Sequence, residues 1–390
     1  MKSFIIEIAR LLMYCLSCIV RSFSTVNKHK VLCVANRGKI YGCNPKYITE
    51  YLLNHFDEYQ IYWLFGRHVD TSNLDKRIHV VRPFTFKYIW TINTAGIIIN
   101  NFRSRFYNMS WKKRQNQIYI MTWHGPLPLK KIEKDLKIES LQSYQKIIDE
   151  DNKYCDLMLS CSQFTTRLIR GAMGYNGEIL EDGVPRNDIF FDQSKFDGFK
   201  DNISKKYNFS QKEKVVLYAP TFRTDHSTDS YDIVWDFISP SLKKHFNDDS
   251  FIILYRIHPD LKVNFSIKGD SSLRIINVSD YPDMQELLCI SDLLITDYSS
   301  TMFEYAILKR PCFIYASDYD RYDRDFYFDI KQLPFPFSKN SAELSKNIQC
   351  FNEDNYLKSI DSFMNKELGY EEDGNASESL CKWIYNKTNV

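Results

Sequence analysis

The sequence is poor in glycine, and it contains no glycine-rich phosphate loop of a known pattern. Glycine supplies 13 of the 390 residues, about 3% where roughly 7% is usual. Neither GxGxxG nor GxxxxGK followed by Ser or Thr occurs. The dinucleotide-binding fingerprint and the P-loop are therefore both excluded.

The sequence also lacks an excess of one charge. It has 51 Lys and Arg against 49 Asp and Glu, a net charge of +2, so we expect no nucleic-acid partner. The charge is unevenly distributed, because residues 1–39 hold seven basic residues and one acid, Glu7. This end of the chain carries +6 and the remainder −4.

No apolar run is long enough to span a bilayer. Glu7 and Arg10 interrupt the apolar stretch 4–20, leaving a run of about ten residues where about 20 are needed. A cleavage site of small residues is missing, which disfavours a signal peptide. We expect residues 1–26 to form an amphipathic helix on the anionic cytoplasmic face of the membrane. The alternative is a helix packed on the protein's own surface.

The ten cysteines form no metal-binding or disulfide pattern. They are scattered along the chain, and several lie in apolar runs, such as Cys33 and Cys312. Buried reduced thiols are the better interpretation. Cys15 and Cys18 have zinc-like spacing but no second pair or nearby histidine. These features predict a reducing compartment and no bound metal.

Short β-branched runs alternate with helical patterns along the chain. This is the rhythm of βαβ units, and it predicts an α/β protein with two doubly wound domains facing each other over a cleft. A polar stretch at 192–214 separates two series of strands. The predicted domains are residues 27–200 and 201–390. The predicted strands cover 31–35, 61–65, 96–100, 118–123 and 156–160, and then 215–219, 251–257, 273–278, 292–296 and 311–316.

Polar residues follow four of these strands. The strand 118–123 leads into His124 and Gly125, with Lys130 and Lys131 further on. A histidine on a strand-end loop is placed for proton transfer, although a helix cap or a backbone hydrogen bond is the alternative. The lysines would bind phosphate or form a solvated helix face.

The strand 251–257 ends with Arg256 and His258, which alternation puts on the same face. Both would reach one anion, although a structural ion pair is the alternative. The strand 215–219 leads to Thr221 and Arg223, a hydroxyl and a guanidinium suited to phosphate.

The strand 292–296 turns into a helix at Asp297, Ser299, Ser300 and Thr301. Hydroxyls and free N–H groups at a helix start bind phosphate, although an ordinary N-cap is the alternative. Glu304, one turn along, would accept hydrogen bonds from sugar hydroxyls. Together the four strand ends predict a site for a diphosphate.

The acidic loop 318–325 contains two DxD patterns. We do not expect a required metal or other cofactor there, because the basic and hydroxyl groups neutralise phosphate unaided.

Five motifs in order resemble the CDP-glycerol glycerophosphotransferases, which are the teichoic-acid primases and polymerases and their capsule-synthesis relatives. They are TWHG with LKKIEKD, GVPRND at 183–188, YAPTFR at 218–223, RIHPD at 256–260 and DLLITDYSSTMFEYA with KRPCFIYA at 292–316. The resemblance implies a GT-B-like pair of Rossmann domains, with a CDP-alditol donor held by the second domain. It places the family's essential histidines at His124 and His258, and its diphosphate-binding hydroxyls at Ser299 and Ser300. The family's commoner motif HGTPLK corresponds to HGPLPLK in this sequence, which is one residue longer before the lysines.

The resemblance further implies a reaction and its partners. An acceptor hydroxyl would attack the β-phosphorus of CDP-glycerol and release CMP, with His124 as general base. His258, Arg256, Arg223 and the two serines would hold the diphosphate. The acceptor would be a lipid-linked or polymeric glycan. Two rival functions remain: a GT-B nucleotide-sugar glycosyltransferase, and a non-catalytic scaffold of a polymer-assembly complex.

Overall fold

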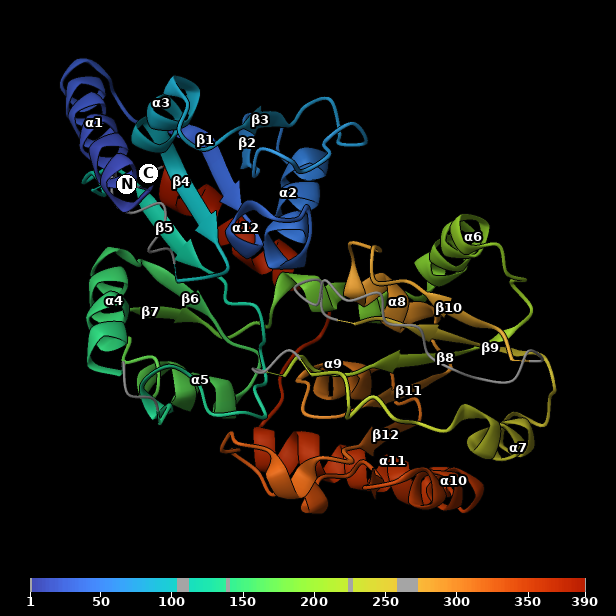
Figure 1. Ribbon diagram of the computed structural model, residues 1–390. Coiled ribbons are helices and arrows are strands. Elements are labelled where there is room, and N and C mark those ends of the chain that lie inside the picture. The colour runs from blue at the N-terminus through green and yellow to red at the C-terminus, as the bar shows by residue number, and fades with distance from the viewer. Residues whose placement is uncertain (1, 104–111, 138–140, 224–226, 258–272, 390) are drawn as a thin grey trace. The chain divides into compact units, whose positions relative to one another are not determined.

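A computed structural model describes residues 2–103, 112–137, 141–223, 227–257 and 273–389, with side chains from Leu11 onward. The chain forms two compact units (Figure 1). Unit 1 consists of Met1–Pro126, Glu133–Asp188 and Glu371–Val390, and unit 2 of Leu127–Ile132 and Ile189–Tyr370.

This division differs from the predicted boundaries at three places. The chain enters unit 2 near residue 189 rather than 201, because the polar stretch 192–214 is no linker: its helix α6 (Phe196–Tyr207) packs against α8 (Met284–Ile290) of unit 2. Residues 371–390 return to unit 1, where α12 (Ala376–Thr388) packs on α2 (Cys43–His55). The six residues Leu127–Ile132, here called the crossing segment, belong to unit 2.

Unit 1 contains a seven-stranded parallel sheet in the order β3-β2-β1-β4-β5-β6-β7. Its central strands β1 and β4 are rich in Val and Ile and are buried on both faces, as parallel strands between helices require. The strands are β1 (Asn27–Val34), β2 (Gln60–Leu64), β3 (His79–Val81), β4 (Ala95–Asn100), β5 (Ile118–Met121), β6 (Leu157–Leu159) and β7 (Glu178–Leu180). The remaining helices of this unit are α1 (Lys2–Phe23), α3 (Phe86–Thr94), α4 (Leu141–Tyr154) and α5 (Gln163–Arg170).

Unit 2 contains a six-stranded parallel sheet in the order β10-β9-β8-β11-β12-β13. Both sheets therefore have the Rossmann strand order, which confirms the prediction of an α/β protein with two Rossmann-like domains. The strands are β8 (Lys214–Ala219), β9 (Phe251–Tyr255), β10 (Ile275–Asn277), β11 (Leu293–Thr296), β12 (Cys312–Tyr315) and β13 (Phe337–Ser338). The other helices are α7 (Trp235–Phe246), α9 (Thr301–Ile307), α10 (Ser341–Gln349) and α11 (Glu353–Ser362).

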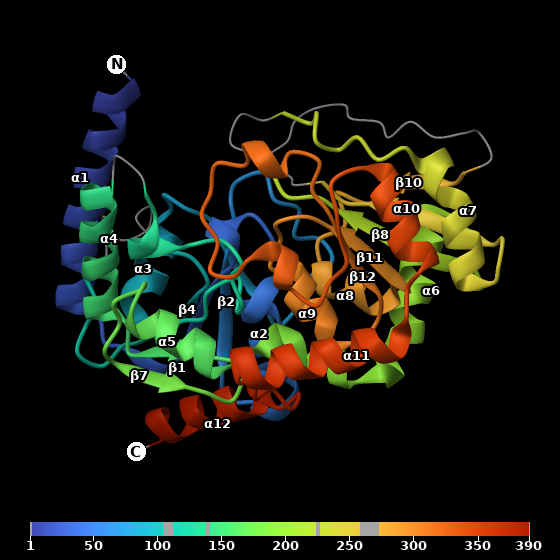
Figure 2. The same cartoon turned by 90° about the horizontal axis from the view of Figure 1, so that it is seen from below.

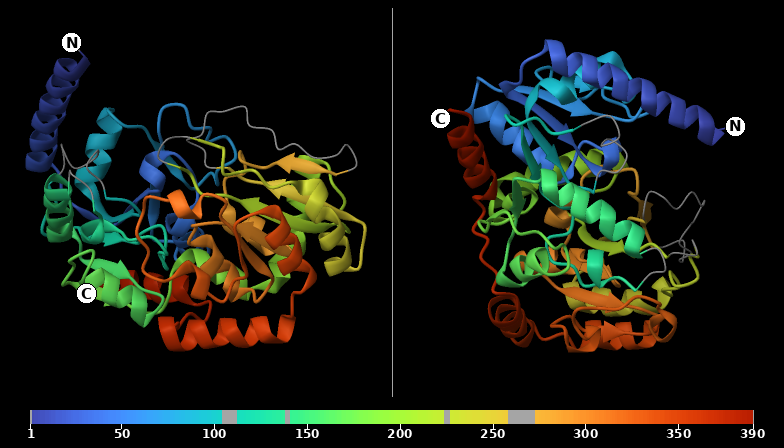
Figure 3. Two further views of the ribbon diagram at one scale, coloured as in Figure 1. Left: turned by 60° about the horizontal axis from the view of Figure 1, so that its bottom comes forward. Right: turned by 90° about the vertical axis from the view of Figure 1, so that its left-hand side faces the viewer.

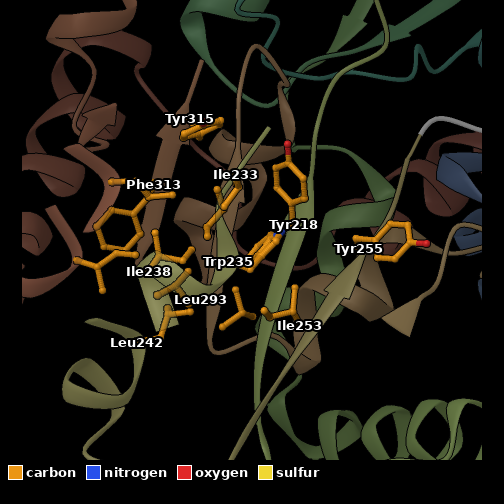
Figure 4. Close-up of a cluster of buried hydrophobic side chains, with 14 of the residues drawn as sticks. Tyr218, Ile233, Trp235, Ile238, Leu242, Ile253, Tyr255, Leu293, Phe313 and Tyr315 are labelled. Atoms are coloured by element: carbon orange, nitrogen blue, oxygen red, sulfur yellow. The ribbon is translucent and has the colours of Figure 1, made fainter. Parts of the chain in front are cut away.

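One face of the unit 2 sheet packs under α7 and α10. Alternate residues of β8, β9, β11 and β12 meet Trp235, Ile238 and Leu242 of α7 (Figure 4). The side chains of Tyr218 and Trp235 make an edge contact at 5.5 Å between ring centroids. This apolar core fixes the strands, and with them the residues that follow each strand end.

The N-terminal helix α1 packs against α3 (Figures 2 and 3). Ser17 and Val20 are buried, and Ser17 Oγ exchanges hydrogen bonds with the Asn93 side chain. Another side of α1 exposes Leu11, Leu12, Leu16, Ile19 and Phe23, with Phe23 85% exposed. Among the described residues, no helix combines the length and apolar content that crossing a bilayer requires. The helix thus packs on the protein and also presents an apolar face, and its membrane role stays a prediction.

Candidate active site

His124 follows β5 in unit 1, and its ring orientation is fixed by one hydrogen bond. The ring Nδ1 lies 2.9 Å from the carbonyl oxygen of Asn101. A carbonyl oxygen only accepts, so Nδ1 carries the proton and Nε2 keeps its lone pair. Trp123, two residues beyond the end of β5, has a left-handed backbone with φ of 56°, a strained conformation for a residue other than glycine. The loop therefore presents a histidine whose Nε2 can accept a proton.

Aromatic rings cover the His124 imidazole. Phe102 stacks on it with centroids 3.7 Å apart and planes 9° apart, and the Trp123 ring lies at 4.5 Å. The pKa of His124 is lowered to about 4, mainly by burial; the hydrogen bond to Asn101 opposes this shift, and the charges of Arg186 and Arg37 add to it. The imidazole is therefore neutral at pH 7, as a general base must be.

Two side chains that the sequence did not reveal hold this loop. Arg186 Nη1 donates to the carbonyl oxygen of His124 at 2.8 Å. Asn44 Nδ2 donates to the carbonyls of Thr122 and Trp123 at 3.1 and 3.2 Å, and its Oδ1 accepts from the Arg186 N–H. The only sequence signal for either residue was the GVPRND motif, which contains Arg186. Arg186 positions the loop that carries His124.

The two lysines after His124 do not form a helix face. Beyond Gly125 and Pro126 the chain enters the crossing segment of unit 2, where Lys130 forms an isolated antiparallel bridge with Phe326. Lys131 donates its N–H to the Asp325 carbonyl, and its Nζ lies 3.9 Å from the Asp325 carboxylate. Lys130 is partly buried, and burial lowers its pKa to about 7, with Arg324 acting in the same direction.

Asp297 joins the ends of β8 and β11 in unit 2. Its Oδ1 accepts from the Thr221 and Tyr298 N–H groups at 2.8 and 2.6 Å, and its Oδ2 lies 2.8 Å from Arg223 Nη2. The carboxylate is buried. The Thr221 Oγ1 has no hydrogen-bond partner among the described residues. Asp297 thus positions the strand end, and the predicted contact of Thr221 with phosphate stays a prediction.

Arg223 is engaged more fully than the sequence suggested. Besides Asp297 it meets Asp318, with Nε 2.6 Å from Oδ2, and its guanidinium lies 4.9 Å from the centroid of Tyr298. Burial lowers the pKa of Arg223, but the two carboxylates outweigh burial and raise it. Its predicted phosphate contact stays a prediction, since the guanidinium already bridges two acids.

The hydroxyls at the start of α9 differ in their contacts. Ser299 Oγ donates to Thr301 Oγ1 at 2.8 Å and accepts from the Thr301 N–H at 3.2 Å. Ser300 is the N-cap residue but its side chain makes no cap hydrogen bond. Glu304 is buried and accepts from Gln285 at 3.3 Å. The predicted contacts of Ser299 and Ser300 with a diphosphate, and of Glu304 with sugar hydroxyls, stay predictions.

Arg256 follows β9 and is partly buried. Its Nη2 donates to the Tyr281 carbonyl at 3.3 Å, while Nε has no partner in the described part of the chain. Burial lowers the pKa of Arg256, opposed by Asp283 and Tyr207. His258, the predicted second histidine, lies outside the described residues, so its role stays a prediction.

The acidic loop is occupied by basic partners. Asp318 accepts from Arg223, and Asp320 accepts from Lys339 Nζ at 2.7 Å. No group of three or more His, Cys, Asp or Glu side chains with metal-binding geometry occurs over the ranges that the structure describes.

Comparison with known proteins gives one family across nearly the whole chain. A family model described as CDP-glycerol:poly(glycerophosphate) glycerophosphotransferase matches residues 14–386. The teichoic acid poly(glycerol phosphate) polymerase of Staphylococcus epidermidis is 33% identical over 362 residues, 89% of this chain and 49% of that protein. The teichoic acid glycerol-phosphate transferase of Staphylococcus aureus is 31% identical, over 92% of this chain and 93% of that protein. The chain spans about half the length of the first relative and most of the second.

A solved structure shares the fold over the full length. The wall teichoic acid polymerase TagF, in a histidine-to-asparagine variant soaked with CDPG, is 29% identical with a TM-score of 0.84. The match covers 99% of this chain and 95% of that chain. Similarity in sequence and in fold therefore extends over both units.

Proposed function

The chain belongs to the CDP-glycerol:poly(glycerophosphate) glycerophosphotransferase family, and from this premise we propose that it transfers glycerol phosphate from CDP-glycerol to a hydroxyl group of a lipid-linked or polymeric glycan. In this reaction the acceptor oxygen forms a bond to the β-phosphorus, and the bond from that phosphorus to CMP breaks. The acceptor proton passes to a base, and CMP leaves. The product would belong to a teichoic-acid-like polymer, as for the relatives named above.

The observation that carries this proposal is the state of His124. Its Nδ1–H is committed to the Asn101 carbonyl, and its pKa of about 4 keeps Nε2 unprotonated at neutral pH. An unprotonated nitrogen on a fixed ring is suited to take the acceptor proton. Arg186 supports this role by holding the His124 carbonyl, and thereby the backbone of the loop.

Unit 2 supplies groups suited to the donor's diphosphate. Thr221 Oγ1 and Arg256 Nε are buried donors without partners among the described residues, and Ser300 adds a hydroxyl at the start of α9. Phosphoryl transfer needs orientation and charge neutralisation more than covalent catalysis. We therefore expect transfer to proceed without an added cofactor, and activity to persist in the presence of a chelator.

Attachment to the membrane surface would bring the enzyme to a lipid-linked acceptor. The exposed apolar side of α1 (Leu11, Leu12, Leu16, Ile19 and Phe23) and the basic character of residues 1–39 support this location. We propose a peripheral position on the cytoplasmic face.

A donor screen tests the proposal. Purified protein is incubated with CDP-glycerol, CDP-ribitol or UDP-sugars, each with and without a short lipid-linked acceptor, and release of CMP or UDP is followed. Acceptor-dependent CMP release from CDP-glycerol is the expected result. UDP release would instead indicate a sugar transferase, and no release from any donor would favour a scaffold. CDP-ribitol measures selectivity for the alditol.

A further inference from the structure

The crossing segment places one lysine in unit 2 with a defined backbone. The Tyr327 N–H donates to the Leu129 carbonyl at 2.8 Å, and the Lys131 N–H donates to the Asp325 carbonyl at 2.9 Å. Lys130 lies between them, opposite Phe326 in the antiparallel bridge. Hydrogen bonds on both sides therefore fix where the Lys130 side chain begins.

The described surroundings of Lys130 are short of negative charge. Its bridge partner Phe326 stacks on Tyr298, the residue after Asp297, with ring centroids 5.5 Å apart. Among the described residues, three charged groups act on the Lys130 ammonium: Arg324 from the acidic loop, Asp297 from the β11 end and Arg223 from the β8 end. Asp297 is already paired with Arg223 at 2.8 Å. No hydrogen bond or ion pair to the Lys130 ammonium occurs within the described ranges. Two cations and one shared carboxylate leave this partly buried amine poorly compensated when it is charged.

A diphosphate at the same strand ends would reverse this balance. It carries two negative charges near neutral pH, and Asp297 is the residue that joins the Thr221 and Tyr298 strand ends. Asp297 is already paired with Arg223, so the bound anion would supply the negative charge that the Lys130 ammonium lacks. Binding would then favour the charged form of the lysine.

We propose that Lys130 contacts the donor's diphosphate and takes up a proton when the donor binds to unit 2. This inference rests on the proposed function, because it requires a CDP-linked donor at the ends of β8 and β11. Donor binding and protonation are thereby coupled through a residue of the segment that leads away from His124.

The expected proton uptake follows from the free and bound states. Burial lowers the pKa of free Lys130 to about 7, so roughly 90% of the amine is unprotonated at pH 8 and roughly 10% at pH 6. A bound diphosphate raises this pKa, because an opposite charge favours the charged form. Uptake of about 0.9 proton is expected at pH 8 and about 0.1 at pH 6. Above pH 7 the donor affinity should fall by up to about tenfold per pH unit.

Calorimetry of CDP-glycerol binding measures this uptake. Titrations at pH 8 and pH 6 are run in two buffers with different ionisation enthalpies, and the difference in heat gives the protons taken up. The diphosphate diester and the cytosine titrate well below neutral pH, so they contribute little. The expected result is near-complete uptake at pH 8 that is largely absent at pH 6.

Three variants separate this role from a structural one. Lys130→Met should abolish the uptake and weaken donor binding at pH 7 by about 10- to 100-fold. Lys130→Arg keeps a permanent charge, so it should bind without uptake and lose the decline in affinity above pH 7. Lys339→Met is the matched control, because Lys339 is another lysine of unit 2 and is paired with Asp320. It should retain the uptake.

The outcomes are distinct. Binding of CDP-glycerol without proton uptake, or uptake that survives in both Lys130 variants, overturns the inference and leaves the proposed function standing. Failure of the wild-type protein to bind CDP-glycerol overturns both. If Lys130→Met does not fold, the Lys130→Arg variant still decides the matter through its loss of uptake.

Discussion

Replacing Phe102 by serine is expected to raise the pKa of His124 and to make transfer sensitive to acid. The Phe102 ring stacks on the imidazole with centroids 3.7 Å apart. Burial is the largest cause that lowers the pKa of His124 to about 4. A serine exposes one face of the imidazole to water, which stabilises the charged form. Phe102→Ser should therefore move the pKa of His124 toward its ordinary value of about 6.5.

The size of the effect follows from the two pKa values. At pH 5.5 a pKa of about 4 leaves roughly 97% of the imidazole neutral, whereas an ordinary pKa of about 6.5 leaves roughly 9%. The neutral form is the base, so kcat of Phe102→Ser at pH 5.5 should fall by up to about tenfold relative to the wild type. At pH 8 both proteins hold a neutral imidazole, and the base imposes no difference.

The assay combines kinetics with a direct titration. The value of kcat is measured from pH 5 to 8.5 at saturating CDP-glycerol and acceptor, and NMR follows the His124 ring protons over the same range. Phe86→Ser is the control. Phe86 is 63% exposed on α3, so its replacement should change neither the pH dependence of kcat nor the titration of His124. Wild-type His124 titrating near pH 6.5 would refute the pKa argument. If Phe102→Ser raises the pKa of His124 but leaves the decline of kcat at low pH unchanged, the role of His124 as base is refuted.

Three further predictions test other parts of the site. His124→Ala should lower kcat by about 10²- to 10⁴-fold while calorimetry shows nearly unchanged CDP-glycerol affinity; a collapse of that affinity would place His124 on the donor instead. Ser299→Ala combined with Ser300→Ala should weaken donor binding, since a hydrogen bond to a charged group contributes about 1.5–3 kcal/mol. If a binding titration gives the affinity of the wild type, the two serines do not bind the diphosphate and the segment is an ordinary helix N-terminus. Leu12→Ser with Ile19→Ser should reduce co-sedimentation with anionic vesicles without lowering the melting temperature, because both side chains are exposed. Sedimentation equal to that of the wild type would contradict the membrane role.

The sequence predicted the central strands well and the edge strands poorly. Runs such as β4 and β8 are apolar because parallel strands between two helix layers are buried on both faces. The strands that escaped prediction are β3, β7 and β13, of two or three residues each, and all three lie at sheet edges. These three strands are partly exposed and carry no long apolar run, so no pattern marks them. The fourth edge strand, β10, was predicted within 273–278. The predicted strand 118–123 ends early, at Met121.

The candidate site was predictable where chemistry follows a strand and unpredictable where it depends on distant contacts. His124, Thr221 and Arg256 were predicted because polar residues follow apolar runs, and the structure places each of them after a strand. Arg186 reaches His124 across 62 residues, and Asn44 reaches Thr122 across 78. No local pattern encodes such pairs, since they depend on how the chain folds back. The same holds for the crossing segment, whose lysines resembled a helix face in the sequence.

The return of α12 to unit 1 sets the order in which the protein can be completed as it is synthesised. The Asp188 carboxylate accepts from the N–H groups of Ala376 and Ser377, at separations of 188 and 189 residues. A ribosome adding about 5–20 residues per second needs roughly 10–40 s to cover that distance. Throughout that interval the surface of α2 that α12 later covers faces solvent in the nascent chain. A transcript truncated before residue 376 would therefore yield unit 1 with an uncovered apolar surface, a substrate for chaperones and proteases even though every proposed active-site residue is present.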